Sequence, residues 1–307
     1  MERKNFTLVG GDKRNIELAR MLCANGHTVK LCGFSNYELE LPIQCKNLSE
    51  AVKKADYIIG PIPASHNGES FNAPFHNQPI GVEELFKLLQ PKQKFLAGVI
   101  KPEVAELAKR HNVHVIDMLK REELLVRNAI PTAEGAIKIA IEETDITLHG
   151  NAMMVIGNGR IGSILSTMLR GMGAFVSVVV NSGDAAARAE SAGHQAIYFE
   201  DIEYSLPYAD VIFNTVPEIL LDKNNMNLIR KDTLIVDLAS PPYGVEVNDS
   251  RDFGIKVLYT NSLPGKIAPR TAASYILDTI IQIIDEKDRE ENSKDSKKEG
   301  GVDELKK

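Results

Sequence analysis

A glycine-rich segment at residues 155–162 has the spacing of a dinucleotide-binding turn. Gly157, Gly159 and Gly162 form the pattern Gly-x-Gly-x-x-Gly. In such a turn the first glycine permits a tight bend, the second lets the backbone approach a pyrophosphate, and the third lets the following helix pack closely. The N–H groups at that helix N-terminus can bind phosphate. The pattern predicts a bound dinucleotide, and the alternative is a glycine turn that serves packing alone.

The segments around this turn match the elements that must position it. An apolar run at 152–156 predicts a buried strand, apolar residues at helical spacing over 161–169 predict a helix, and 175–180 predicts the next strand. Together they form a βαβ unit with the glycine pattern at its first turn. We therefore expect Asn158, Arg160 and Ile161 to contact the cofactor beside the three glycines.

The end of the second strand normally distinguishes the two nicotinamide cofactors. An acid there binds the 2′-hydroxyl of NAD, but this chain has Asn181 and Ser182, with no acid before Asp184. Asn181 and Ser182 can donate hydrogen bonds to a 2′-phosphate, and Arg188 can reach it from the following helix. We therefore favour NADP, with NAD as the alternative and Arg188 as an ordinary solvated charge in that case.

Three more strands, at 209–214, 234–238 and 257–260, end in polar turns. The carboxyl ends of parallel strands share one edge of the sheet, so these turns should lie beside the glycine turn and hold a nicotinamide ribose and a substrate. Loop chemistry alone is the alternative for each turn. The cofactor contacts expected from the turns are Thr215, Val216, Pro217, Ala239 and Ser240.

Cationic side chains recur in the strand-to-helix turns of both halves of the chain. A guanidinium can bind a carboxylate through two parallel hydrogen bonds, so these cations indicate an anionic substrate. Arg14 and Arg270 are the contacts that we favour, although each cation alone could be an ordinary surface charge. The predicted substrate-binding residues are Asp12, Arg14, Pro63, Lys101, Thr132, Lys266 and Arg270.

A proton acceptor is expected at the segment between the two halves. After Pro131, Thr132 can cap a helix that begins near Ala133, which places Glu134 in its first turn. Glu134 is therefore the favoured base and Asp12 the alternative, and Arg270 completes the predicted catalytic set. A carboxylate is also stabilising at a helix N-terminus without any catalytic role.

The alternation of strands and helices predicts an α/β fold of two doubly wound parallel-sheet, Rossmann-like domains joined by interdomain helices. We expect a flavodoxin- or Rossmann-like substrate domain at 1–131. Its first turn, Gly10-Gly11-Asp12, lacks the third glycine and is not expected to bind nucleotide. We expect an NAD(P)-binding Rossmann domain with the linking helices at 132–285, and a disordered charged tail at 286–307.

Composition excludes several classes of protein. The chain has 307 residues, 43% hydrophobic and 25% charged, as in soluble globular proteins. A net charge of −6 argues against nucleic-acid binding. Cys23, Cys32 and Cys45 lack metal-ligand spacing and predict reduced thiols in a cytosolic protein, with no metal site. We expect no signal peptide and no membrane-spanning segment.

Five segments together resemble the dipicolinate synthase A subunits, a family of sporulation proteins. They are 10–14, 131–137, 157–162, 237–244 and 263–272, and they are spread over nearly the whole chain up to the last helix, with the charged tail outside the resemblance.

This resemblance implies oxidation of dihydrodipicolinate, drawn from the lysine pathway, to pyridine-2,6-dicarboxylate, with a nicotinamide dinucleotide as hydride acceptor. It implies a partner B subunit similar to flavoproteins, with FMN on that partner, in the cytoplasm of the mother cell of a sporulating bacterium. Family members often have arginine where this chain has Asn181, which weakens the NADP assignment. A homodimer is a further expectation.

Three alternatives stay open. A hydroxy-acid dehydrogenase would use a histidine late in the second domain, but the last histidine is His194. A methylene-folate or shikimate dehydrogenase is similar at the turn of Pro264, Gly265 and Lys266. A non-catalytic subunit that binds nucleotide only to organise a complex is the third.

Overall fold

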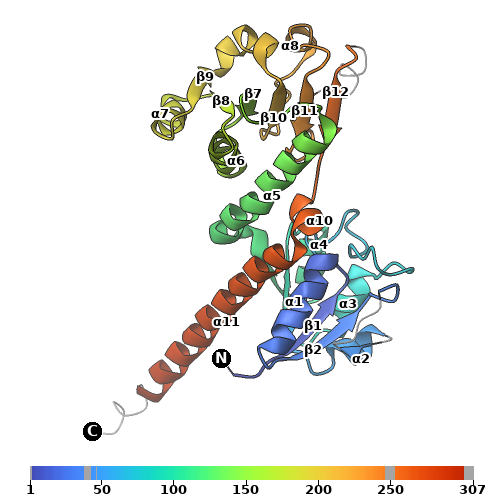
Figure 1. Ribbon diagram of the computed structural model, residues 1–307. Helices are drawn as coiled ribbons and strands as arrows, with labels where there is room; N and C mark the ends of the chain where they lie inside the picture. Colours follow the sequence, from blue (N-terminus) through green and yellow to red (C-terminus); the bar gives the residue numbers. More distant parts are fainter. Residues whose placement is uncertain (1, 38–42, 46, 246–252, 301–307) are drawn as a thin grey trace. The chain divides into compact units, whose positions relative to one another are not determined.

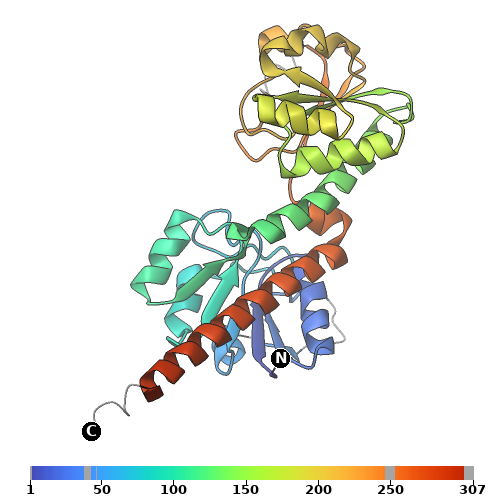
Figure 2. The ribbon, with the colours of Figure 1, turned by 90° about the vertical axis from the view of Figure 1, so that its left-hand side faces the viewer.

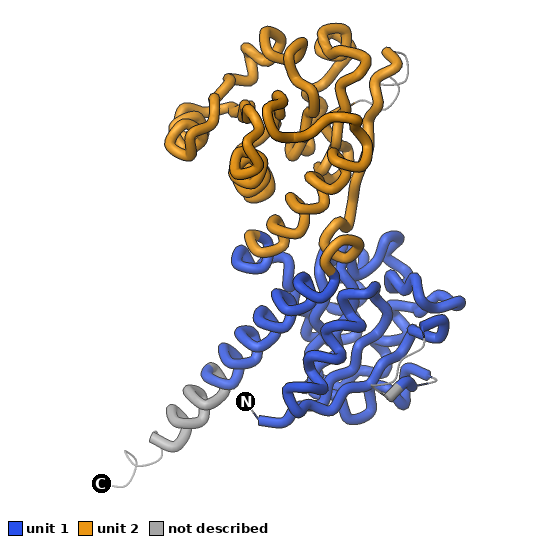
Figure 3. The backbone as a smooth tube through the Cα atoms, viewed as in Figure 1, with its two compact units in different colours: residues 1–125, 269–307 blue, residues 126–268 orange. Residues whose placement is uncertain are grey.

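The structure is a computed structural model that describes residues 2–37, 43–45, 47–245 and 253–300. Close contacts divide the chain into two compact units (Figure 3). Unit 1 comprises Met1–Leu125 and Pro269–Lys307, and unit 2 comprises Val126–Ala268. Each unit contains one six-stranded parallel sheet, so the predicted α/β class with two Rossmann-like domains is confirmed.

The sheet of unit 1 has the strand order β3-β2-β1-β4-β5-β6, with all neighbours parallel. The chain builds outward from β1 in one direction and then returns to build in the other, which is the doubly wound arrangement. Its strands are β1 (Asn5–Val9), β2 (Thr28–Cys32), β3 (Ile43–Gln44), β4 (Tyr57–Ile59), β5 (Lys94–Ala97) and β6 (His114–Asp117). Its helices are α1 (Lys13–Ala24), α2 (Leu48–Val52), α3 (Val82–Leu88), α4 (Pro102–Arg110), the 3₁₀ turn η1 (Met118–Lys120) and α11 (Pro269–Gly300).

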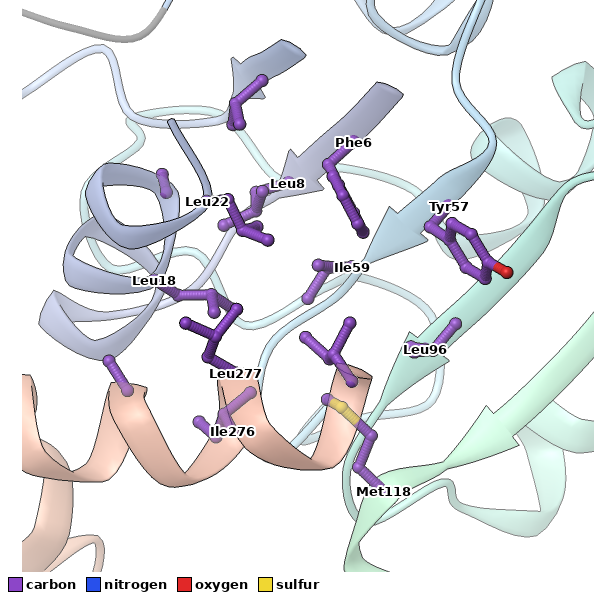
Figure 4. Close-up of a cluster of buried hydrophobic side chains, with 14 of the residues drawn as sticks. Phe6, Leu8, Leu18, Leu22, Tyr57, Ile59, Leu96, Met118, Ile276 and Leu277 are labelled. Carbon is purple, nitrogen blue, oxygen red and sulfur yellow. The ribbon is translucent and has the colours of Figure 1, made fainter. Parts of the chain in front are cut away.

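Helix α11 completes one face of unit 1. Ile276, Leu277 and Ile280 recur at helical spacing and are buried in a cluster with Phe6 of β1 and Leu18 of α1 (Figure 4). This packing places residues 269–285 with the N-terminal unit rather than in the predicted domain 132–285. The predicted disordered tail also differs, because α11 continues to Gly300. Residues 301–307 lie outside the described residues.

Unit 2 repeats the same topology, with the order β12-β11-β10-β7-β8-β9 and all neighbours parallel (Figures 1 and 2). Its strands are β7 (Ala152–Ile156), β8 (Phe175–Val180), β9 (Gln195–Tyr198), β10 (Val211–Asn214), β11 (Leu234–Asp237) and β12 (Lys256–Tyr259). Its helices are α6 (Arg160–Gly171), α7 (Gly183–Ser191), α8 (Lys223–Met226), α10 (Leu263–Ile267) and the 3₁₀ turns η2 (Phe199–Tyr204) and η3 (Leu206–Tyr208). Helix α5 (Glu122–Glu143) enters unit 2 from unit 1.

The helix predicted to begin near Ala133 begins eleven residues earlier. Helix α5 starts at Glu122 and includes Pro131 in its interior. The Thr132 hydroxyl does not cap a helix N-terminus; it donates to the carbonyl of Asn128 at 2.8 Å. Proline has no amide N–H, so a helix that includes it loses one backbone hydrogen bond. The packing of the rest of α5 outweighs this loss here. Glu134 therefore lies exposed in mid-helix and not in a first turn.

Two buried histidines make the fold sensitive to acid. Burial lowers the pKa of His27, helped by the positive charges of the chain N-terminus and Lys4, and the His27 Nδ1 accepts a backbone N–H at 3.3 Å. Burial and then Arg170 lower the pKa of His194, whose ring nitrogens have no hydrogen-bond partner among the described residues. Both folded units therefore favour the neutral ring.

We expect stability to fall as the pH drops from about 7 to about 5, since the unfolded chain binds more protons once its histidines charge near pH 6.5. Urea unfolding across this range measures the effect. His194→Leu should reduce the pH dependence of the unfolding of unit 2. A midpoint independent of pH in the unchanged protein would contradict this expectation.

Candidate dinucleotide site

The three glycines of the turn meet three different spatial constraints. Gly157 has φ +97°, and a Cβ there would lie 2.6 Å from Thr215 Oγ1. A Cβ on Gly162 would lie 1.9 Å from the carbonyl oxygen of Gly157. A Cβ on Gly159 would meet nothing within 4 Å. The first and third glycines are thus required by contacts within the chain, whereas the second borders open space that a ligand can enter.

The first turn of α6 faces this open space with uncapped amides. Gly159 is the N-cap residue, and it provides no side-chain hydrogen bond to the helix. The first N–H groups of an α-helix have no partner inside the helix, and they carry the positive end of its dipole. This arrangement favours an anion such as a pyrophosphate at the turn.

A cavity of about 430 Å³ opens beside the turn at the carboxyl ends of β7, β8 and β10. Its volume lies within the range of small-molecule sites, about 300–1,000 Å³. Nine residues that the sequence predicted as cofactor contacts line it, namely Gly157, Asn158, Gly159, Asn181, Ser182, Arg188, Thr215, Val216 and Pro217.

Apolar residues that no sequence pattern indicated complete the cavity wall. Phe199 and Leu220 are half-buried and line it, together with Val179 and Val180 from the end of β8. Such residues give an aromatic base an apolar surface to contact. Phe199 begins the short 3₁₀ turn η2 and Leu220 lies in a loop, and neither segment has a periodic pattern, so only the tertiary structure brings them to the glycine turn.

Two polar side chains of the cavity hold its turns in place. The Asn158 amide donates to the carbonyl of Ala185 at 3.0 Å, which ties the glycine turn to α7. The Thr215 hydroxyl donates to the carbonyl of Ile156 at 2.8 Å, which ties the end of β10 to β7. The turn is thus preorganised by hydrogen bonds from two neighbouring elements.

The end of β8 presents the groups that bear on the choice of cofactor. Arg188 Nη1 lies 2.8 Å from Asp184 Oδ2, and both side chains are largely exposed. A hydrogen bond from Ser182 lowers the pKa of Asp184, and the bond and charge of Arg188 lower it further. An exposed pair of this kind contributes little stability, so Arg188 can exchange Asp184 for a phosphate at small cost.

A buried carboxylate organises the turn after β11. Asp237 is 0% exposed and accepts from the Asn214 amide at 2.9 Å. It also accepts from the backbone N–H groups of Ala239, Gly244 and Val245, at 3.0, 2.8 and 3.2 Å. This network fixes the loop at 239–245, which carries two of the predicted cofactor contacts.

Five predicted cofactor residues lie outside the cavity lining. Arg160, Ile161 and Gly162 form the first turn of α6, where Gly162 packs against the glycine turn. Ala239 is buried at the start of the loop that Asp237 holds, and Ser240 follows it on the surface. Their contact with a ligand stays a prediction.

In unit 1, Arg14 binds the carboxylate of Asp12, which lies in the same turn after β1. Arg14 is 5% exposed, and its Nε and Nη2 donate to both oxygens of Asp12 at 2.9–3.2 Å. Asp12 also caps α1 by accepting from the backbone N–H of Arg14. Both groups were predicted to contact a substrate, and the structure shows a partly buried ion pair between them.

Arg14 also connects to the segment that carries Pro63. Its Nη2 donates to the carbonyl of Ile62, and the Lys101 ammonium donates to the carbonyl of His66. Four predicted substrate residues of unit 1, Asp12, Arg14, Pro63 and Lys101, are thereby gathered along residues 62–66 at the carboxyl ends of β1, β4 and β5.

The first turn of unit 1 is closed by the chain itself. The Gly11 N–H donates to the carbonyl of Asn72 at 2.8 Å, and a Cβ on Gly10 would lie 3.1 Å from that same carbonyl. Asp12 stands where unit 2 has Gly159, and its carboxylate caps α1 and pairs with Arg14. That unit 1 binds no nucleotide at its first turn stays a prediction.

The remaining candidates are distributed over both units. Arg270 lies in the first turn of α11 in unit 1, is exposed, and makes no ion pair with any described residue. Thr132, Glu134 and Lys266 belong to unit 2, and Lys266 Nζ lies 3.5 Å from Asn261 Oδ1.

Metal sites and membrane spans are both absent from the described residues. Within them, no group of three or more histidine, cysteine, aspartate or glutamate side chains could hold a metal ion. None of their helices combines the length and the apolar character needed to cross a bilayer.

Comparison with known proteins extends over nearly the whole chain. A family model for the N-terminal domain of the dipicolinate synthase A subunit matches residues 5–119, and a model for shikimate / quinate 5-dehydrogenase matches residues 138–255. The dipicolinate synthase A subunit of Bacillus subtilis (strain 168) is 27% identical over 289 residues, which cover 93% of this chain and 97% of the relative.

Solved structures agree with the sequence match. The crystal structure of the dipicolinate synthase A subunit from Bacillus halodurans superposes with a TM-score of 0.84 at 28% identity, covering 91% of this chain and 97% of that one. An L-alanine dehydrogenase, at 15% identity and a TM-score of 0.61 over 90% and 88% of the two chains, shares the fold. By sequence and by fold, the chain resembles dipicolinate synthase A subunits along almost its full length.

Proposed function

We propose that this chain oxidises dihydrodipicolinate to pyridine-2,6-dicarboxylate, with NADP as hydride acceptor and together with a B subunit. One observation carries the proposal. A chain that matches a dipicolinate synthase A subunit over 93% of its length has an open glycine turn beside a cavity of about 430 Å³. A glycine turn kept only for packing would not need open space at Gly159.

The reaction needs an electron acceptor but little acid–base assistance. Removal of a hydride and a proton from the dihydro ring produces an aromatic pyridine, which makes the oxidation favourable. Bound NADP would supply the hydride acceptor. The amides at Gly157–Arg160 would hold its pyrophosphate, and Asn181, Ser182 and Arg188 would hold its 2′-phosphate.

The substrate carries two carboxylates, which we propose are bound by the cationic side chains Lys101, Lys266 and Arg270. Arg270 has the guanidinium geometry that matches a carboxylate, and its side chain is exposed. Arg14 has Asp12 as its carboxylate partner, so its role is to position that turn. Glu134 is the proposed proton acceptor, with Asp12 as the alternative. The proposed setting is the mother cell of a sporulating bacterium, with FMN on the partner subunit.

The first experiment mixes the purified chain with dihydrodipicolinate, with NADP or NAD, and with or without the B subunit. Ultraviolet absorbance follows the pyridine product, and a separate wavelength follows the reduced nicotinamide. Product that appears in step with reduced NADP supports the proposal. Product without reduced nicotinamide would move the oxidation to the partner, and no product from any combination would overturn the proposal.

Arg270→Ala tests the substrate contact within this assay. We expect kcat/KM for dihydrodipicolinate to fall about 10- to 100-fold, since a charge-assisted hydrogen bond to a carboxylate is worth about 1.5–3 kcal/mol. NADP affinity should stay unchanged, because Arg270 is not among the residues that line the dinucleotide cavity. Unchanged turnover would favour a non-catalytic nucleotide-binding subunit.

Arg188→Ala tests the choice of cofactor. We expect the Kd for NADP to rise about tenfold and that for NAD to stay constant, since one charge-assisted contact to the 2′-phosphate is lost. Asp184→Asn is the matched control, because it releases Arg188 from its ion pair and leaves the guanidinium in place. Calorimetric titration measures both affinities. Equal losses for both nucleotides would place Arg188 away from the 2′-phosphate.

A further inference from the structure

We propose that a hollow at the amino ends of β7, β8 and β9 docks the partner subunit, through an apolar projection of that subunit surrounded by basic side chains. The proposal rests on the proposed function for the existence of the partner. The hollow has a volume of about 610 Å³. We call it the aromatic hollow, after Phe175, Tyr204 and Tyr208, which line it.

Hydrogen bonds and strand register bring the three aromatic residues together. Ala152, the first residue of β7, is the register partner of Phe175, the first residue of β8. The carbonyl of Ala152 accepts the N–H of Asp210 at 2.9 Å, which holds the end of η3 and Tyr208 beside the same strand ends. The hollow therefore lies at the amino edge of the sheet, whereas the glycine turn lies at its carboxyl edge. A partner docked at the amino edge would leave the dinucleotide cavity accessible.

The connection from β9 to β10 explains why aromatic rings stand in solvent here. It consists of the short turns η2 and η3 in place of an α-helix. Ile202 and Leu206 point into the core, at 3% and 0% exposed, and this leaves Tyr204 and Tyr208 on the outside. Folding of this unit alone buries neither tyrosine.

The exposure of these rings is unusual for side chains of their size. Phe175, Tyr204 and Tyr208 are 72%, 70% and 72% exposed, around a floor that includes the buried Met153 and Met154. Aromatic side chains can bury about 150–250 Å² each and dominate the energy of protein interfaces. Contiguous exposed apolar surface with a polar rim marks an interaction site.

Charge at the rim selects the kind of partner. Glu200, Asp201 and Glu203 are all exposed on η2, the element that carries Tyr204. Arg170 is the single charged side chain among the described residues that line the hollow, and its Nη1 donates to the carbonyl of Ala192. A hydrogen bond to Glu203 and the charges of Glu203 and Asp201 raise the pKa of the Tyr204 phenol, so these carboxylates lie beside it. The edge of the hollow that η2 forms is therefore acidic and complements a basic partner surface.

The same acidic rim disfavours a second copy of this chain as the occupant. A two-fold contact uses the same patch on both copies, which would bring these carboxylates toward each other. The chain as a whole carries a net charge of −6, which adds to the repulsion. The charge pattern therefore favours the partner subunit of the proposed complex as the molecule that binds in the hollow.

The test compares binding of the purified B subunit to the full chain and to the variants Tyr204→Ala and Tyr208→Ala. Calorimetry measures the Kd for the B subunit, and a separate titration with NADP reports whether each variant is folded. Tyr198→Ala is the matched control, since Tyr198 is an exposed tyrosine at the opposite, carboxyl end of β9. Glu200→Lys tests the charge of the rim.

We expect Tyr204→Ala and Tyr208→Ala each to weaken binding of the B subunit, with a Kd at least tenfold higher. Their NADP affinity should be unchanged, and Tyr198→Ala should leave the Kd for the B subunit unchanged. Glu200→Lys should weaken binding most at low salt. In the turnover assay, excess B subunit should restore the activity of the variants.

Two results would overturn the inference and leave the proposed function standing. In the first, the unchanged chain turns over and binds the B subunit, but the tyrosine variants bind it equally well. In the second, sedimentation of the chain alone shows a dimer that Tyr204→Ala dissociates, which would assign the hollow to a second copy. A third result is that the chain forms no complex with the B subunit and turns over by itself. This result would overturn both the docking inference and the partnership with the B subunit, but the proposed oxidation would stand.

Discussion

Replacing Gly162 with alanine is expected to weaken NADP binding at least 100-fold and to lower the free energy of unfolding by about 1–3 kcal/mol. The added Cβ would lie 1.9 Å from the carbonyl oxygen of Gly157, which is a backbone atom of the turn itself. A side chain cannot rotate away from this contact, so either α6 or the turn must shift. Both carry the amides proposed to hold the pyrophosphate, and a shift of about 1 Å misplaces them.

The same helix offers a matched control for this substitution. Gly171 is the last residue of α6, and a Cβ there would meet nothing within 4 Å. Gly171→Ala should therefore keep NADP affinity and raise stability by about 0.5–1 kcal/mol, as alanine is the better helix residue. Fluorescence titration with NADP and urea unfolding measure the two effects. Equal NADP affinity of Gly162→Ala and the unchanged chain would contradict binding at this turn.

Replacing Asp237 with asparagine is expected to lower the free energy of unfolding by about 3–5 kcal/mol. The buried carboxylate accepts hydrogen bonds from the Asn214 amide and from three backbone N–H groups of the following loop. Asparagine would turn an NH₂ group toward these donors and leave buried amides without an acceptor. The loop at 239–245 would lose its anchor, and any ligand contact by Ala239 and Ser240 would weaken with it.

Asp232→Asn is the control for Asp237→Asn. Asp232 is 77% exposed and pairs with Arg230 at 3.1 Å on the surface. The charge change is identical, but an exposed ion pair contributes no more than about 1 kcal/mol. Urea unfolding of both variants at neutral pH compares them directly. If both variants lowered the free energy of unfolding by the same small amount, the carboxylate of Asp237 would not hold the loop.

Local patterns in the sequence predicted the elements that form the dinucleotide cavity. The apolar runs at 152–156 and 175–180 are strands with those bounds, and nine of the predicted cofactor residues line one cavity. Both signals depend on short segments, because strand formation follows apolar runs and the glycine spacing follows backbone sterics. Strand β9 of unit 2 (Gln195–Tyr198) was not predicted, because its four residues carry too little pattern.

Predictions that depended on distant parts of the chain were less successful. Proline is the usual sign of a helix boundary, yet α5 continues through Pro131. The charged C-terminal segment was assigned to a tail, but Arg121 lies 2.6 Å from Glu286 of α11. A salt bridge between residues 165 positions apart leaves no trace in local composition.

The sequence by itself determined the two Rossmann-like sheets, the resemblance to dipicolinate synthase A subunits and the residues of the glycine turn. Each of these follows from local spacing or from motifs along the chain. The tertiary structure alone decided that α11 packs with unit 1, that Arg14 binds Asp12, and that Asp237 anchors the loop after β11. It alone also placed Phe175, Tyr204 and Tyr208 around one hollow. Burial and hydrogen-bond partners depend on which distant segments pack against each other in the folded chain. Local sequence patterns do not specify these long-range contacts individually.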